Sequence, residues 1–156
     1  MEVIVMKKAV SIILAIVTLF SCLTACGIDK YKDYYATDMQ AKGFMQDDEV
    51  LINFEPNTVE LITDYEKYTS YHFNLDYTEE FFANNNLLVF IVTSCSSDQM
   101  EYVELRNKDG LLYPLFERKK IGENEPVTDD FIVHSYCVEI SKKCEYKAGE
   151  IIYNYK

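Results

Sequence analysis

The chain has 156 residues, a formal net charge of −11 and 49% hydrophobic residues. This length suits one domain that buries its own hydrophobic core. The acidic charge argues against nucleic acid as a partner, because phosphates require a basic face, and it predicts no attraction to anionic lipid headgroups.

The first 27 residues carry the most specific pattern in the chain. Lys7 and Lys8 precede the apolar run Ala9–Phe20, and the pentapeptide LTACG follows at 23–27. A basic segment, an apolar segment and small residues before a cleavage site make up a secretory signal peptide. The order Leu-Thr-Ala-Cys-Gly is that of a bacterial lipobox, in which the thiol of Cys26 takes a diacylglycerol as a thioether. We therefore expect residues 1–25 to be a lipoprotein signal peptide.

An ordinary cleaved signal peptide and an uncleaved membrane helix are the alternatives. A spanning helix needs roughly 20 mainly apolar residues, and the run from Ala9 to Cys26 is shorter and ends in polar residues. Either Met1 or Met6 can be the initiator, and a start at Met6 gives the more usual beginning MKKAV.

Lipidation of Cys26 predicts where the protein resides. Each buried methylene contributes about 0.8 kcal/mol, and a single acyl chain binds a membrane only reversibly. Two or three chains on one cysteine hold the protein stably, so that it is anchored without spanning the bilayer. The expected location is the cell membrane, lipid-anchored on the extracytoplasmic face.

The chain after Cys26 divides into a polar stretch and a domain. Residues 27–49 are charged and show no apolar period, so residues 26–49 are expected to be the lipidated N-terminus and a tether. Packing of Tyr31, Tyr34 and Tyr35 on the domain or on a partner is the alternative. Residues 50–156 are predicted to form a single β-rich globular domain.

The first half of this domain contains two predicted strands and a helix. Val50–Phe54 and Thr58–Ile62 are predicted strands, with Pro56 between them. Thr63 or Asp64 then caps a predicted helix over Tyr65–His72. A single helical turn carrying Phe81 and Phe82 follows.

The second half reads as strands and turns. Leu87–Cys95 is apolar, too short to span a membrane and rich in β-favouring residues, which predicts the central strand. Lys108-Asp109-Gly110 is a hairpin signal. The other predicted strands are Met100–Asn107, Leu111–Arg118, Phe131–Ile140 and Glu150–Tyr155. These elements predict an α+β fold of mainly antiparallel β-structure, a small sandwich or half-open barrel of six to seven strands with one short helix packed on it.

Three cysteines remain in the predicted mature chain beside Cys26. A Cys137–Cys144 bridge, a Cys95–Cys137 bridge and three reduced thiols are all compatible with the sequence. None of the three has the spacing of a metal-binding motif.

Few residues suggest catalysis. His134 follows Asp129 and Asp130, so a carboxylate–imidazole pair is conceivable, whereas a surface histidine on a strand is the simpler interpretation. Ser94, Ser96 and Ser97 flank Cys95 without a known nucleophile motif. His72 at a predicted helix end can interact with the helix dipole. Asp47-Asp48-Glu49 lacks the ligand spacing of a calcium loop. We expect no catalytic residue, no cofactor and no metal site.

Four segments carry a resemblance to known proteins: TVELITDYEKYTSY, YTEEFFANNNLLVFIVTSCSSD, VELRNKDGLLY and FIVHSYCVEISKK. From Thr58 onwards the chain resembles small lipoproteins of Gram-positive gut bacteria. The central part is similar, more loosely, to the β-rich domain of PrcB-type protease-complex subunits. Ser94-Cys95-Ser96-Ser97 replaces the glycine-rich turn often found after the apolar strand of that group. The resemblance implies no functional residue besides the lipobox Cys26.

Two functional hypotheses follow. The first is a membrane-anchored extracytoplasmic lipoprotein whose domain is a non-enzymatic module that binds an envelope protein or peptide. The alternative is a small extracytoplasmic hydrolase or metal-dependent enzyme that uses His134 with nearby carboxylates. A protease-inhibitor-like or stress lipoprotein is a third possibility that the sequence does not separate from the first.

Overall fold

The computed structural model describes residues 33–45, 53–95, 97–98, 100–119, 128 and 130–155. The chain divides into two units, Met1–Asp33 and Tyr34–Lys156, and the architecture below is that of the second. The predicted signal peptide and the predicted lipidation site, Cys26, lie outside the described residues.

Nine strands and two short helices make up the described part of the chain. The first elements are β1 (Tyr35–Ala36), β2 (Lys42–Phe44), β3 (Thr58–Ile62), α3 (Tyr65–Ser70), α4 (Glu79–Asn84) and β4 (Asn85–Ser94). The remaining elements are β5 (Met100–Lys108), β6 (Leu111–Arg118), β7 (Ile132–Ser141), β8 (Lys147–Ala148) and β9 (Ile152–Tyr155).

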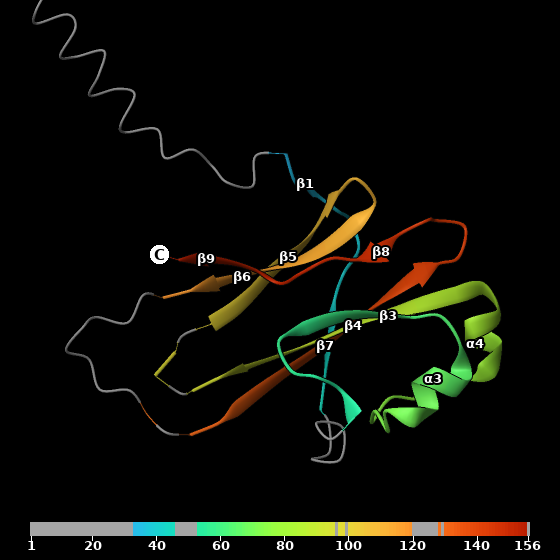
Figure 1. Cartoon of the computed structure of the whole chain (residues 1–156), viewed down its shortest axis with the longest axis horizontal. Coiled ribbons are helices and arrows are strands. Elements are labelled where there is room, and N and C mark those ends of the chain that lie inside the picture. Colours follow the sequence, from blue (N-terminus) through green and yellow to red (C-terminus); the bar gives the residue numbers. More distant parts are fainter. Residues whose placement is uncertain are drawn as a thin grey trace, which may run out of the picture. The chain divides into compact units, whose positions relative to one another are not determined.

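These strands form two sheets (Figure 1). The four-stranded sheet has the order β2-β7-β4-β3 and is antiparallel throughout. The five-stranded sheet has the order β1-β5-β6-β8, with β9 also paired to β6. Only β8 and β9 run parallel to their neighbour in the described residues. The predicted α+β class with mainly antiparallel structure is confirmed, and the two separate sheets make it a sandwich, with more strands and one more helix than expected.

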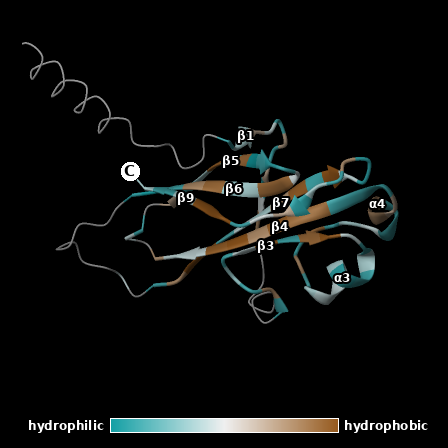
Figure 2. Ribbon diagram, turned by 45° about the horizontal axis from the view of Figure 1, so that its top comes forward, coloured by the Kyte–Doolittle hydropathy of each residue, from teal (hydrophilic) through white to brown (hydrophobic). Residues whose placement is uncertain are grey.

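The central strand β4 is buried on both faces. Leu88, Phe90 and Val92 lie in the core between the two sheets, and the intervening residues belong to a second core beneath the helices. All six residues from 87 to 92 have no exposed surface. Figure 2 shows the resulting apolar colour along β4. Burial on both faces explains why the sequence here is a continuous apolar run and not an alternation.

Helices α3 and α4 cover the face of the four-stranded sheet that turns away from the other sheet. Asp64 caps α3, because its carboxylate accepts a hydrogen bond from the Lys67 backbone N–H at 2.8 Å. Tyr68 and Phe82 then place their rings 5.3 Å apart in the helix-side core. The predicted helix after Asp64 is confirmed, and it ends at Ser70.

The β5–β6 hairpin is also confirmed. Asp109 and Gly110 have φ angles of 53° and 79°, which are the left-handed values that a two-residue turn between twisted strands requires. The Asn107 side chain accepts a hydrogen bond from the Gly110 backbone N–H at 3.1 Å.

The N-terminal stretch differs from the expected tether. Within residues 26–49, strand β1 pairs with β5 and strand β2 pairs with β7, so this stretch contributes one edge strand to each sheet. We call Tyr34–Met45 the strap. Its two strands are very short, so no apolar period marks them, and their partners lie far along the chain.

Residues 50–54 were expected to form a strand, but the described part of this range does not. Asn53 and Phe54 are not in a strand, and the Phe54 side chain is buried in the helix-side core. Residues 50–52 lie outside the described part.

Candidate functional site

The end of β4 brings together several residues that the sequence singled out. Ser94 Oγ lies 3.1 Å from His134 Nε2 on the neighbouring strand β7. The register explains this contact, because Val92 is opposite His134 and Ser94 is two residues further along the same face of β4. Both side chains are partly buried. An imidazole and a hydroxyl at this distance have the geometry of a base and a nucleophile.

A second polar group follows directly along the chain. Cys95 Sγ lies 3.1 Å from Ser97 Oγ, and the Ser97 hydroxyl also accepts a hydrogen bond from the Thr128 backbone N–H at 3.2 Å. The hydrogen bond from Ser97 lowers the pKa of the Cys95 thiol, an effect that burial partly opposes. Ser96 lies outside the described residues.

An ion pair fixes the turn after Cys95. Both carboxylate oxygens of Asp98 face Arg118 of β6, with Nε 2.8 Å from Oδ1 and Nη2 2.6 Å from Oδ2. The Asp98 side chain is 1% exposed. One hydrogen bond and one close contact of opposite charges join the two side chains, so this pair holds the end of β4 against the five-stranded sheet.

Among the described residues, the ring of His134 has a hydrogen-bond contact with the Ser94 hydroxyl. The carboxylates considered as its partners from the sequence are Asp129 and Asp130. Asp129 lies outside the described residues, and Asp130 is exposed just before β7. His72 is exposed after α3 with a φ of 55°, a conformation common directly after a helix end.

The three described cysteines are free thiols. Cys137 pairs with Val89 in the middle of the β4–β7 ladder, whereas Ser94, the neighbour of Cys95, pairs with Ile132. At about 3.3 Å per residue, Cys95 and Cys137 are too far apart for a disulfide. Cys144 lies beyond the end of β7 and is exposed.

Buried Cys137 belongs to a polar cluster beneath the loop before α4. The Tyr77 hydroxyl donates to Glu139 Oε1 at 2.9 Å and lies 3.9 Å from Cys137 Sγ. Burial raises the pKa of Tyr77 and that of Cys137. Lys42 of the strap contacts the same Glu139 oxygen at 2.5 Å, and its hydrogen bond lowers the pKa of Glu139. The cluster therefore joins three segments that are distant in sequence.

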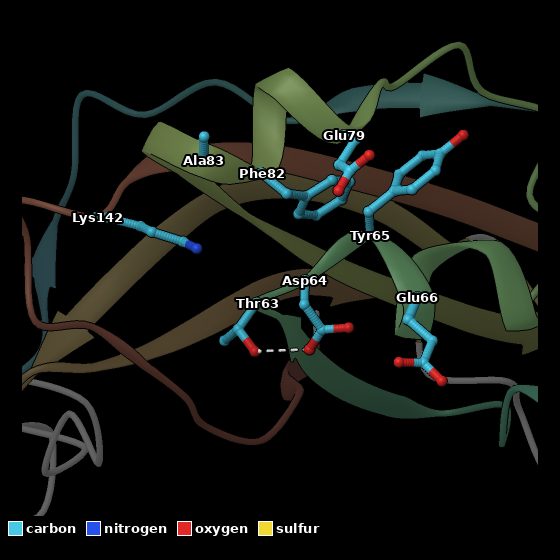
Figure 3. A pocket seen from close by; sticks show the side chains of 8 residues that line it. All are labelled: Thr63, Asp64, Tyr65, Glu66, Glu79, Phe82, Ala83 and Lys142. Atoms are coloured by element: carbon cyan, nitrogen blue, oxygen red, sulfur yellow. Dashed lines mark hydrogen bonds between the residues drawn. The ribbon is translucent and has the colours of Figure 1, made fainter.

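A hollow of about 500 Å³ lies between the starts of α3 and α4 (Figure 3). Asp64, Glu66 and Glu79 line it beside the rings of Tyr65 and Phe82. Lys142 points into it from the other side (Figure 3). Acidic residues in the first turn of a helix are favoured by the helix dipole, which accounts for their positions here. No group of three metal-ligating side chains occurs among the residues that the structure describes.

The face of the five-stranded sheet that turns away from the other sheet carries aromatic and charged side chains. We call it the outer face. Tyr34 packs edge-on against Tyr113, with ring centroids 4.8 Å apart, and Lys108 Nζ lies 4.8 Å from the centre of the Tyr34 ring. Arg106 and Glu104 form an ion pair at 2.7 Å beside them. Both described helices pack on the other sheet, so neither covers this face.

The sequence points to Ser94 and His134 separately and does not reveal their contact. The period-2 alternation of each strand gives the face on which a side chain lies. It does not give the register between two strands that are 40 residues apart. The cluster around Tyr77 and the outer face were missed for the same reason.

No helix in the described ranges is long and apolar enough to cross a membrane. The comparisons with known proteins returned no matching family model, no matching curated protein and no matching solved structure. The resemblance to small lipoproteins and to PrcB-type domains thus stays a prediction.

Proposed function

We propose that this protein is a lipoprotein anchored at the extracytoplasmic face of the cell membrane, and that its sandwich domain binds an envelope protein or peptide without catalysing a reaction. The observation that supports the location is the lipobox at 23–27, which follows a basic and an apolar segment. The observation that supports binding is the outer face of the five-stranded sheet.

This face has the chemistry of a protein-binding surface. Tyr34 and Tyr113 are partly exposed aromatic side chains, and tyrosine and arginine are enriched where proteins contact one another. Arg106, Lys108 and Glu104 provide charges of both signs within the same patch. A polar, mixed-charge rim around aromatic rings suits a protein or peptide partner.

The anchor is tested by metabolic labelling with a fatty acid and by mass spectrometry of the mature N-terminus. We expect an acylated chain that begins at Cys26. Cys26→Ala should abolish labelling, and Cys22→Ala is the matched control, because this cysteine lies within the predicted signal peptide and should leave labelling unchanged. An unacylated exported chain would contradict the anchor.

Binding is tested by photo-crosslinking in living cells. A photoreactive phenylalanine derivative at position 113 should give a discrete adduct, and the same group at Glu66 on the opposite side of the sandwich should not. Lys108→Glu should reduce the yield from position 113 at least tenfold, since it reverses a charge on the outer face. Equal adducts from both positions, or none from position 113, would contradict this surface as the binding site.

The contact between Ser94 Oγ and His134 Nε2 favours a second candidate, a small hydrolase in which Ser94 is the nucleophile and His134 the base. A fluorescent fluorophosphonate should then label the native chain. Labelling should disappear in Ser94→Ala and remain in Ser70→Ala, an exposed serine of α3. Absence of labelling in the native chain would remove this candidate.

A further inference from the structure

We propose that the strap, Tyr34–Met45, is a releasable latch that sets how far the domain reaches from its lipid anchor. This inference rests on the proposed acylation of Cys26. It concerns the strap as a mechanical element and not the identity of the bound partner.

The first part of the strap is held by the five-stranded sheet. Tyr35 and Ala36 pair with Asn107 and Arg106 of β5, and the Thr37 backbone N–H donates to the Leu105 carbonyl at 2.9 Å. The Tyr34–Tyr113 ring contact fixes the end of this part.

The second part is held by the four-stranded sheet. β2 pairs with Ser135–Cys137 of β7, and Phe44 packs against Phe73 with ring centroids 5.7 Å apart. Met39 and Ala41 lie between the two paired parts and pack against the core between the sheets. The strap therefore crosses one side of the sandwich from one sheet to the other (Figure 1).

These attachments are weak compared with the rest of the fold. The two strands of the strap contain 2 and 3 residues, whereas β4 contains 10. The side chains of Lys42 and Glu139 are 66% and 42% exposed, so solvent and salt screen the ion pair between them. Thr37 Oγ1 is buried without a hydrogen-bond partner among the described residues. Short edge ladders of this kind open locally while the core of a domain stays folded.

Release changes the length of free chain behind the anchor. Tyr34 lies eight residues after Cys26, so with the strap docked this segment spans at most about 28 Å. With the strap released, the first described residue after it that is buried in a core is Phe54, so the domain is then held from that residue onwards. The segment from Cys26 to Phe54 can span up to about 100 Å. The docked strap thus keeps the free chain behind the anchor short, and release of the strap lengthens it.

Local opening is tested by hydrogen exchange on the full chain. Backbone amides of the strap should exchange at least 100-fold faster than those of β4.

Lys42→Cys places a thiol directly opposite Cys137 in the ladder, at a Cα separation that a disulfide can bridge. This lock should slow exchange in the strap at least tenfold. Asp38→Cys, an exposed strap position, is the matched control and should not.

If the lock at position 42 disturbs the buried Cys137, the pair Ala36→Cys and Arg106→Cys closes the β1–β5 ladder instead. Strap amides that exchange as slowly as those of β4 would overturn the proposal, because the strap would then open only when the whole domain unfolds. This readout does not depend on the lipid, so it judges the latch even if Cys26 proves to be unacylated.

The reach is measured by neutron reflectometry of the acylated chain on a supported bilayer. The double variant Tyr34→Ala, Phe44→Ala loses both ring contacts. Because the average span of a coil grows as the square root of its length, its domain should lie about 10–15 Å further from the bilayer than that of the locked variant. Equal distances in an acylated, folded double variant would overturn the proposal.

Discussion

The Tyr71 hydroxyl donates a hydrogen bond to Glu60 Oε2 at 2.6 Å. Burial and this carboxylate raise the pKa of Tyr71 to about 12, and burial also raises the pKa of Tyr102 to about 12. In the unfolded chain both hydroxyls lose their protons near pH 10. The folded state therefore holds protons that the unfolded state releases as the pH rises from 10 to 12.

The contribution of these two side chains to stability should consequently be fully present below pH 10 and be lost between pH 10 and pH 12. Urea unfolding at several pH values measures this fall. Tyr71→Phe should lose less stability than the wild-type chain across the same range, because the raised pKa of Tyr71 is gone. A wild-type chain with constant stability up to pH 12 would contradict the prediction.

Gly149 lies where a side chain has no room. A Cβ atom there would come within 2.7 Å of the Leu112 carbonyl oxygen and 2.9 Å of the Tyr113 ring. Gly149→Ala should destabilise the domain by about 1–3 kcal/mol, the usual cost of overpacking, as measured by urea unfolding. Gly43→Ala is the matched control, since its Cβ would meet neighbours only at 3.9 Å. Equal effects of the two substitutions would contradict this account.

At the scale of elements, α3 depends on its cap. It has only six residues, too few for a helix to be stable by itself in water. Asp64→Ala removes the hydrogen bond to the Lys67 backbone N–H and should cost about 1 kcal/mol in the free energy of unfolding. Asp64→Asn keeps a capping oxygen and should cost much less. Equal losses in Asp64→Ala and Asp64→Asn would contradict the capping role, because the negative charge of Asp64 and not its hydrogen bond would then stabilise α3.

Elements also differ in how much the sequence reveals about them. The β5–β6 hairpin is visible in the sequence because Asp109 and Gly110 supply the positive φ angles of its turn. α3 is visible because its capping residue stands directly before it. β1, β2 and β8 are short edge strands without such signals. They form through pairing with their neighbours in the sheets, so the sequence predicted a tether in place of β1 and β2 and no strand in place of β8.

For the whole molecule, Phe90 is the central residue of the core between the sheets. Its ring contacts those of Tyr102, Phe116 and Tyr136, with centroids 5.3–6.1 Å away. Phe90→Ala should cost about 3–5 kcal/mol, a large share of the stability of a domain of this size. Calorimetry or urea unfolding measures the loss. Phe131→Ala, at a site that is 64% exposed, should change little.

By itself the sequence determined the features that are local in the chain: the central strand, the hairpin and the capped helix, and through their succession the fold class. It also predicts that Cys26 is acylated. Each depends on residues a few positions apart, and a processing signal is recognised as a linear string.

Only the tertiary structure decided which distant residues meet. Lys42 and Glu139 are 97 residues apart, and Ser94 and His134 are 40 apart. Both contacts depend on strand register, which the burial of the two cores fixes cooperatively. The strap is the clearest case, because a polar segment with no apolar period becomes an edge strand in two sheets only where those sheets are already formed.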